Sequence, residues 1–303
     1  MLSKDDVIRI AKESGFIAAG IAPARLNDSY YRNLVKWLDL GYHGDMQWMR
    51  NHQDSRADIS RRFPWVKSVL VVADNYYCEK SPDGQFPKVS RYAWGIDYHI
   101  IVHNKLKDVL GSLKAMDSKT VGKIYVDTGA MLEKGYAVSA GLGWQGKNTN
   151  LIVNGHGSFS FLGILLLNIE LEYSIPTEDL CGNCRRCIDA CPTGALVEPY
   201  IIDSRKCISY LTIEKRSEHD EKEKSMLNGW LYGCDICQNV CPYNMKWSRN
   251  AEETRYFKNL KLLEKSPNEW IDLSEEVFKD QFRESPIKRV KLEGVRRNIL
   301  SLL

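Results

Sequence analysis

The chain has 303 residues, of which 44% are hydrophobic and 27% charged, the composition of an ordinary globular protein with room for two domains. Its net charge of +3 is nearly neutral, so overall charge gives no argument for a nucleic-acid partner and leaves only a local basic face open. No apolar run is long enough to cross a bilayer and the N-terminus lacks the apolar core of a secretory signal, so we expect a cytoplasmic protein with no membrane segment.

Helices and strands alternate in the first 170 residues. Ser3 and Asp6 predict a capped helix over residues 3–14, and Asp97 caps a longer helix that runs to Met116. A proline- and glycine-rich loop is predicted at 78–88. The other predicted elements are strands at 16–22, 66–73 and 123–126, helices at 30–40 and 131–140, and a hairpin that joins 151–153 to 158–167 through the Gly-His-Gly turn at 155–157. Together these elements predict a domain of α+β or α/β type around one core.

The composition changes after Ile175-Pro176. Residues 181–242 contain eight of the nine cysteines and little apolar periodicity, so we expect bound metal to hold this segment together more than a core does. The charged run at 214–224 is predicted to be a solvated helix or loop. Residues 248–303 follow a helical pattern interrupted by two prolines. We therefore expect an α+β protein with an N-terminal α/β unit at 1–172, a metal-binding unit at 173–247 and a short helical unit at 248–303.

The cysteines form two motifs of the iron–sulfur type. The first is C-x2-C-x2-C-x3-C-P. The second is C-x2-C-x3-C-P, which lacks the first cysteine, and Cys207 can take the place of that cysteine. In such motifs three closely spaced thiolates hold one [4Fe–4S] cluster, and the cysteine before proline ligates the other cluster. The spacing therefore predicts two clusters in a ferredoxin-like segment. Their expected ligands are Cys181, Cys184, Cys187 and Cys241 for one cluster, and Cys191, Cys207, Cys234 and Cys237 for the other.

Two structural zinc sites are the alternative to this interpretation. Zinc sites use paired C-x2-C units and do not need the x3-C-P continuation, so the spacing favours iron. The ninth cysteine, Cys78, lies outside both motifs and is expected to be a spare thiol.

Two fully ligated clusters transfer single electrons and have no open iron for chemistry on an organic substrate. An enzyme of this kind therefore needs a second redox centre in residues 1–170. No dinucleotide-binding G-x-G-x-x-G follows a strand there. Gly141, Gly143 and Gly146 have a similar spacing but follow a predicted helix, so we expect a loop at this position.

Five stretches together are similar to a known family. They are Ser90–Gly95 (SRYAWG) with Asp97-Tyr98-His99, then Val126-Asp127-Thr128, Gly141–Leu151 (GLGWQGKNTNL), the cysteine motifs, and Phe282–Arg289 (FRESPIKR). With them the chain resembles the epoxyqueuosine reductases, cobalamin-dependent enzymes of queuosine synthesis in tRNA, from about residue 5 to 300. Longer family members continue into a helical-repeat domain, which is expected to be missing here together with any tRNA contacts that those repeats make.

The resemblance implies a nitroreductase-like N-terminal domain that binds base-off cobalamin against the ferredoxin-like segment. The clusters would reduce the cobalt, which would open the epoxide, and an acid would protonate the departing oxygen. The chain has no D-x-H-x-x-G motif to supply a lower histidine ligand, which agrees with base-off binding. On the family's pattern the acid is Asp127, and the residues expected to contact the cofactor are Arg50, Ser90, Asp127, Asn148, Leu151, Ser209, Cys234 and Asp235.

Asp127 and the pair His99 and His103 each have a simpler interpretation. A catalytic acid must stay protonated near neutral pH, so we expect burial to raise the pKa of Asp127. From the residues alone, Asp127 would instead cap the helix predicted at 131–140. His99 and His103 have the spacing of a metal pair on a helix, but without a third ligand we expect a solvated or core-edge pair.

The expected partners are a tRNA with epoxyqueuosine at the anticodon wobble position and an external electron donor such as ferredoxin or flavodoxin, with the chain acting as a monomer. The segment 279–297 has seven basic residues against three acids, which suits a phosphate backbone or, equally, a solvated helix face. Two other functions remain open: a dicluster electron carrier, for which the N-terminal domain is larger than needed, and a corrinoid reductive dehalogenase, which usually has an export signal.

Overall fold

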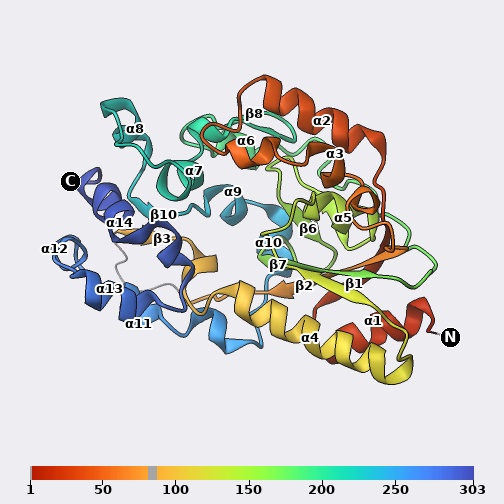
Figure 1. The fold of residues 1–303 in the computed structure, drawn as a ribbon. Coiled ribbons are helices and arrows are strands. Elements are labelled where there is room, and N and C mark those ends of the chain that lie inside the picture. Colours follow the sequence, from red (N-terminus) through yellow and green to blue (C-terminus); the bar gives the residue numbers. More distant parts are fainter. Residues whose placement is uncertain (1, 81–86) are drawn as a thin grey trace.

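A four-stranded sheet forms the centre of the computed structural model, which describes residues 2–80 and 87–303 (Figure 1). The strand order is β1, β2, β7, β4, and the strands span Ala18–Pro23, Ser68–Asn75, Ser160–Leu167 and Gly122–Tyr125. Every neighbouring pair is antiparallel. The prediction of an α/β unit was therefore wrong and α+β is correct, because an α/β domain needs parallel neighbours joined by crossover helices.

Both faces of this sheet are buried. In β2, Leu70 and Val72 belong to one hydrophobic core, whereas Val69, Val71 and Ala73 belong to another. Successive side chains of a strand point to opposite faces, so a strand covered on both sides has a continuous apolar sequence. The prediction of a buried strand at this position is confirmed.

Helices cover the two faces. Helix α1 (Lys4–Glu13) and helix α4 (Tyr98–Met116) lie along one face, and α5 (Glu133–Ser139) packs on the other (Figure 1). The predicted caps are present: Ser3 accepts the N–H of Asp6, and Asp97 accepts the N–H of His99. Helix α2 (Asp28–Asp39) and the short α3 (Gln53–Arg56) lie beyond α5.

The predicted hairpin at 151–167 does not form. Strand β6 (Leu151–Val153) pairs instead with β5 (Gly143–Gln145), so part of the predicted glycine loop is a strand. The glycine turn closes back on Val153 through a bridge to Gly157, and β7 then pairs with β2 along its whole length. The eight residue pairs of that ladder outcompete a three-residue hairpin.

The cysteine segment consists of short elements joined by loops. The charged run at 214–224 was predicted to be a solvated helix or loop. It ends in α8, a helix without buried residues that is capped by Asp220, which agrees with the prediction. Strand β10 pairs in parallel with β3 (Lys88–Val89), which brings this segment against the N-terminal half. The elements in order are α6 (Arg186–Asp189), β8 (Leu196–Glu198), β9 (Ile201–Ile202), α7 (Ile208–Ile213), α8 (Glu221–Met226), β10 (Trp230–Tyr232), α9 (Ile236–Asn239) and α10 (Pro242–Trp247).

The C-terminal residues are helical, as predicted, and Pro267 and Pro286 each occupy the first turn of a new helix. The α-helices are α11 (Leu260–Leu263), α12 (Pro267–Ile271), α13 (Glu275–Phe282) and α14 (Lys291–Leu300). Their core also contains Val89 and Trp94 from the N-terminal half, so the first and third predicted units share hydrophobic packing. The domain limits themselves stay predictions.

Two further points complete the fold. Most of the predicted loop at 78–88, residues 81–86, lies outside the described residues. Among the helices that the structure describes, none has both the length and the apolar character needed to cross a bilayer.

Candidate functional site

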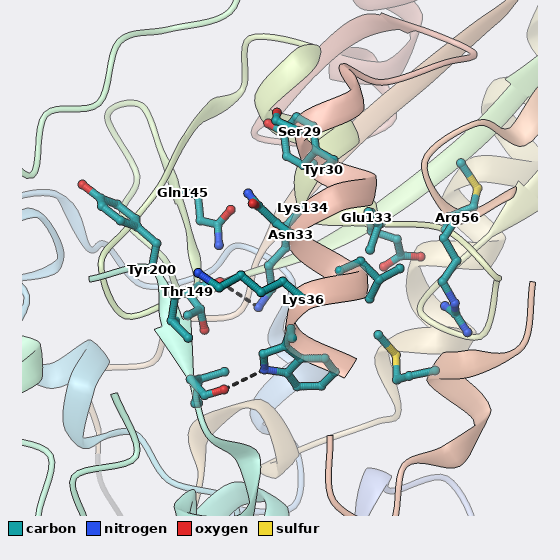
Figure 2. Close-up of a pocket in the computed structure, with 18 of the residues that line it drawn as sticks. Ser29, Tyr30, Asn33, Lys36, Arg56, Glu133, Lys134, Gln145, Thr149 and Tyr200 are labelled. Carbon is teal, nitrogen blue, oxygen red and sulfur yellow. Dashed lines mark hydrogen bonds between the residues drawn. The ribbon is translucent and has the colours of Figure 1, made fainter. Parts of the chain in front are cut away.

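A cavity of about 830 Å³ opens between α2, α5 and the residues around β9 (Figure 2). Its wall combines apolar side chains with amide, hydroxyl and ammonium groups. Two hydrogen bonds fix the wall: Trp37 donates to the Ile202 carbonyl over 2.7 Å and Lys134 donates to the Thr149 carbonyl over 3.0 Å. The polar lining residues include Asn33, Lys36, Arg56, Asp127, Glu133, Lys134, Gln145 and Thr149.

Asp127 lies at the edge of this cavity in the loop between β4 and α5. Its backbone has a φ of +58°, the left-handed region that non-glycine residues rarely adopt. Its N–H donates to Oε1 of Glu133 over 2.7 Å. Helix α5 begins at Glu133 and its N-cap, Leu132, makes no side-chain cap, so Asp127 is not the helix cap that the residues alone favoured.

A chain of charged groups connects Asp127 to the C-terminal segment. His99 Nε2 lies 3.7 Å from Oδ2 of Asp127, and His99 Nδ1 lies 2.6 Å from Oδ1 of Asp97. The other oxygen of Asp97 is 3.0 Å from Nζ of Lys288. Tyr98 stacks on the His99 ring at a centroid distance of 4.2 Å. These contacts link Asp127, at the cavity edge, to α4 and to the segment before α14.

Electrostatics at this edge differ from the expectation. Burial raises the pKa of Asp127, but the nearby His99 imidazole and Tyr98 hydroxyl outweigh burial and leave its pKa below the ordinary value. The expected rise was therefore wrong, because the sequence did not reveal the histidine that faces the carboxylate. Burial lowers the pKa of His99, yet the nearby Asp127 carboxylate and the hydrogen bond with Asp97 raise it to about 9. Burial and the charge of Asp127 raise the pKa of Glu133 to about 8.

The cysteines of the two motifs gather into two neighbouring groups. Burial raises the pKa of Cys187, and the nearby thiols of Cys181, Cys241 and Cys184 raise it further. Burial also raises the pKa of Cys234 to about 12, with further contributions from Cys207, Asp235 and Cys191. Burial raises the pKa of Cys237, followed by the charges of Cys207, Cys234 and Cys187, so Cys187 and Cys237 lie where the two groups meet. Within residues 2–80 and 87–303, no three His, Cys, Asp or Glu side chains are arranged to bind a single metal ion.

The stretch Gly141–Leu151 packs directly against the first cysteine group. Trp144 is fully buried and packs on Cys241 and the rings of Tyr243 and Trp247. Lys147 donates to the carbonyls of Gly182 and Cys184, the latter over 3.0 Å. This stretch therefore connects the cysteine segment to the wall of the cavity, which Gln145 and Thr149 also line.

A buried polar contact joins the N-terminal half to the second cysteine group. Ser90 Oγ donates to Oδ1 of Asp235, and the N–H of Arg91 donates to Oδ2 over 2.8 Å. The Arg91 guanidinium lies 3.4 Å from the same carboxylate and donates to Asn239 over 2.8 Å. Because Asp235 follows Cys234 directly, this contact fixes the second group relative to the sheet domain.

Comparison with known proteins identifies the family. Residues 180–244 match a family described as "4Fe-4S double cluster binding domain", and residues 56–128 match "Epoxyqueuosine reductase QueG, DUF1730". The epoxyqueuosine reductase of Cellulophaga algicola is 39% identical over 299 residues, which cover 98% of this chain and 96% of the relative. That of Synechocystis sp. is 41% identical over 284 residues, which cover 92% and 98%. The chain belongs to the epoxyqueuosine reductase family.

Solved epoxyqueuosine reductases have the same fold. A crystal structure with an epoxyqueuosine-modified tRNA-Tyr stem loop has a TM-score of 0.89 at 29% identity, covering 99% of this chain and 80% of that one. The Bacillus subtilis enzyme with its catalytic aspartate loop swung out of the active site has a TM-score of 0.89 at 28% identity, with coverage of 99% and 80%. The double-cluster match over the eight cysteines confirms iron–sulfur binding rather than zinc.

The residues expected to contact cobalamin do not all lie together in this reductase. Ser90, Cys234 and Asp235 meet at the second cysteine group, and Asn148 joins them by donating to the Cys237 carbonyl over 3.4 Å. Ser209 lies in α7, where its N–H points to the Cys207 thiol.

Three expected site residues lie elsewhere. Asp127 lines the cavity, whereas Leu151 is buried in the core beneath α5. Arg50 is exposed and donates to the Leu38 carbonyl over 2.9 Å.

Sequence reasoning did not single out four residues around the candidate site: His99, Glu133, Trp144 and Lys147. Three of them, His99, Trp144 and Lys147, lie in the stretches that carried the resemblance, which was the available signal. His99 and His103 were expected to be a solvated or core-edge pair, and in the structure His99 lies beside the carboxylates of Asp97 and Asp127. The basic segment was also overestimated, since Arg297 is buried and donates to backbone carbonyls of 211, 215 and 217. The ninth cysteine, Cys78, is buried in the C-terminal core.

Proposed function

We propose that this chain is an oxidoreductase that converts epoxyqueuosine to queuosine in tRNA. The observation that carries the proposal is the paired carboxylate and imidazole of Asp127 and His99 at the edge of a large cavity, in a chain that matches epoxyqueuosine reductases over nearly its full length. Loss of the epoxide oxygen as water forms one C=C bond, breaks two C–O bonds, and consumes two electrons and two protons. The chain must therefore supply single electrons at one side of the site and protons at the other.

For the electrons we propose two [4Fe–4S] clusters. The first would be held by Cys181, Cys184, Cys187 and Cys241 and the second by Cys191, Cys207, Cys234 and Cys237. Support comes from the mutual electrostatic influence of the thiols within each set. Cys187 and Cys237 are close enough to influence one another, which keeps the distance between the two sets short.

The external electron donor would approach the first cluster. Gly182, Asn183, Arg185 and Arg186 around it are exposed, and so is Lys246 in α10. Exposed cations beside a redox centre favour an acidic carrier, a property that suits a small ferredoxin or flavodoxin.

For cobalamin, the residues of the cavity fit the group. A corrin carries peripheral amides and its nucleotide tail carries a phosphate, and the wall offers amides from Asn33 and Gln145 and ammonium groups from Lys36 and Lys134. Trp37, Leu34 and Met131 supply apolar surface. When bound, cobalamin would supply a strongly reducing metal centre. We propose that the N-terminal domain is nitroreductase-like. The residues that would lie toward the clusters are Ser90, Asn148 and Leu151 of that domain and Ser209, Cys234 and Asp235 of the cysteine segment, with Arg50 near the rim.

For the protons we propose Asp127 as the group that faces the substrate oxygen. At neutral pH the proton of the pair resides on His99, because the pKa of Asp127 is lowered and that of His99 is raised to about 9. Asp127 would pass protons from His99 to the departing oxygen. Asp97 keeps the imidazole oriented through its 2.6 Å contact.

The tRNA would approach the side on which the segment 279–297 lies. Six of its seven basic residues are exposed, although Lys288 and Arg289 already pair with Asp97 and Glu214. Arg283 and Lys291 are the exposed cations best placed to take a phosphate. We further propose a cytoplasmic monomer.

The test is reconstitution. The chain is purified without oxygen, loaded with cobalamin, and supplied with a reductant and tRNA that carries epoxyqueuosine. We expect about eight iron atoms per chain and the appearance of queuosine in nuclease digests analysed by mass spectrometry. An iron-loaded, corrin-bound sample that leaves the epoxide intact overturns the proposal.

A further inference from the structure

The loop between β4 and α5 holds Asp127 in a conformation that is unfavourable by itself. A non-glycine residue at a φ of +58° is strained by about 1 kcal/mol or more. Two backbone hydrogen bonds lie near Asp127: Thr128 donates to the Val126 carbonyl, and Leu132, at the far end of the loop, donates to the Arg56 carbonyl. Neither bond involves the backbone of Asp127 itself, so another contact must hold that residue.

Glu133 is the side chain that does so. Its Oε1 accepts the N–H of Asp127 over 2.7 Å, and in the described part of the chain no other side chain hydrogen-bonds to the backbone of residues 127–131. Glu133 is the first residue of α5, whose following turn is buried. Tyr136 in that turn fixes the helix by donating to the Ala24 carbonyl over 2.9 Å. The Glu133 carboxyl group is therefore attached to a helix that is itself packed in the core.

We propose that Glu133 is a positioning residue: its carboxyl group holds the Asp127 backbone in the left-handed conformation that aims the Asp127 carboxylate at His99 and into the cavity. Glu133 need not touch the substrate in this role. The inference rests on the proposed function for its catalytic meaning, but the contact can be tested without it.

The electrostatics of the loop agree with this role. Burial and the charge of Asp127 raise the pKa of Glu133 to about 8, so near neutral pH the group accepts the N–H as an uncharged carboxyl. A neutral acceptor avoids charge repulsion between the Glu133 side chain and the nearby Asp127 carboxylate, whose backbone N–H it accepts. The charged groups that face it are Asp127, His99 and Lys134, with Lys36 and Arg56 across the cavity.

The experiment compares three variants of the iron-loaded chain. Glu133→Ala removes the acceptor, Glu133→Gln keeps an uncharged acceptor oxygen, and Glu221→Ala is the matched control. Glu221 is likewise the first residue of a short helix, α8, but its side chain is 89% exposed. Hydrogen exchange of the Asp127 amide is measured by mass spectrometry with fragmentation to single residues, together with kcat and KM for epoxyqueuosine tRNA.

We expect exchange at Asp127 to become about tenfold faster in Glu133→Ala, the factor that corresponds to one lost hydrogen bond. Its kcat should fall with KM nearly unchanged, Glu133→Gln should recover most of both properties, and Glu221→Ala should match the unmodified chain. Unchanged exchange in Glu133→Ala, or equal damage in Glu133→Gln, overturns the inference. If no variant and no unmodified chain forms queuosine, the proposed function fails, while the exchange data still decide the role of Glu133.

Discussion

The cysteine segment and the cavity edge both bring reactive side chains close together, but they do so in different ways. In the cysteine segment seven of the eight thiols come from two runs of at most eleven residues, so local spacing brings most of them together. At the cavity edge, Asp97, His99, Asp127 and Lys288 come from three distant stretches and meet only because the sheet and the C-terminal helices bring them together.

This difference predicts different responses to mutation. Where neighbours in sequence hold a metal, loss of one ligand removes a large binding energy and with it local structure. Where distant residues meet on a rigid scaffold, loss of one side chain leaves the fold intact and changes the chemistry. The following changes test this distinction, from the largest expected effect to the smallest.

Removing a cluster ligand should have the largest effect. In Cys237→Ala we expect iron to fall from about eight to about four atoms per chain, with activity abolished, because one cluster loses a ligand where the two sets meet. Anaerobic iron analysis and the visible spectrum measure this. Cys78→Ala is the control, since that thiol lies in the C-terminal core. Full iron content in Cys237→Ala would contradict the assigned ligand set.

Changing the acid should abolish chemistry without disturbing the fold. In Asp127→Asn we expect kcat to fall by about 10² to 10⁴, the range for general acid–base catalysis, with the iron content unchanged. Single-turnover formation of queuosine in tRNA is the measurement. A variant that turns over at the original rate would remove Asp127 from the reaction and leave His99 as the group to test.

The buried carboxylate of Asp235 lies between the two regions and should affect stability. Asp235→Ala leaves Ser90 and the Arg91 guanidinium without their partner, and we expect a loss of about 3 kcal/mol in the free energy of unfolding. Asp189→Ala removes a carboxylate from the same segment that is 66% exposed beside Arg185, and should cost under about 1 kcal/mol. Urea unfolding under anaerobic conditions compares the two, and equal costs would mean that the Asp235 contact does not join the two regions.

The smallest effect concerns pH. Because the pKa of His99 is raised from 6.5 to about 9, its stabilising contribution is complete below about pH 6.5 and is lost as the pH rises through about 9. The free energy of unfolding should therefore decline between pH 7 and 9, by about 1–2 kcal/mol after allowance for partial exposure, and His99→Gln should flatten the decline. His103→Gln is the control. A decline that persists in His99→Gln must come from another group.

The two regions also differed in how well the sequence predicted them. The double-cluster segment could be recognised from the spacing of Cys181 to Cys191, because cysteines close in sequence have few ways to surround one cubane. The individual strands of the sheet were predicted. Their antiparallel order and the β5–β6 pairing were not, because strand pairing depends on contacts between segments far apart in sequence, which a local pattern does not contain. His99 and Glu133 were missed for the same reason, since their roles depend on facing Asp127 across a loop. The pKa of Asp127 was predicted in the wrong direction because the sequence does not show that the His99 imidazole faces its carboxylate.

Val89 and Trp94 pack among the last four helices, so truncated or chimaeric versions of this protein must keep that shared core intact. The tail supplies Lys288 to Asp97 and also encloses the stretch that leads into α4. A fragment ending near residue 247 would expose that apolar surface and remove the cation that pairs with Asp97. Chimaeras made by exchanging tails between relatives should therefore exchange residues 88–97 as well, so that both halves of this shared core come from one parent.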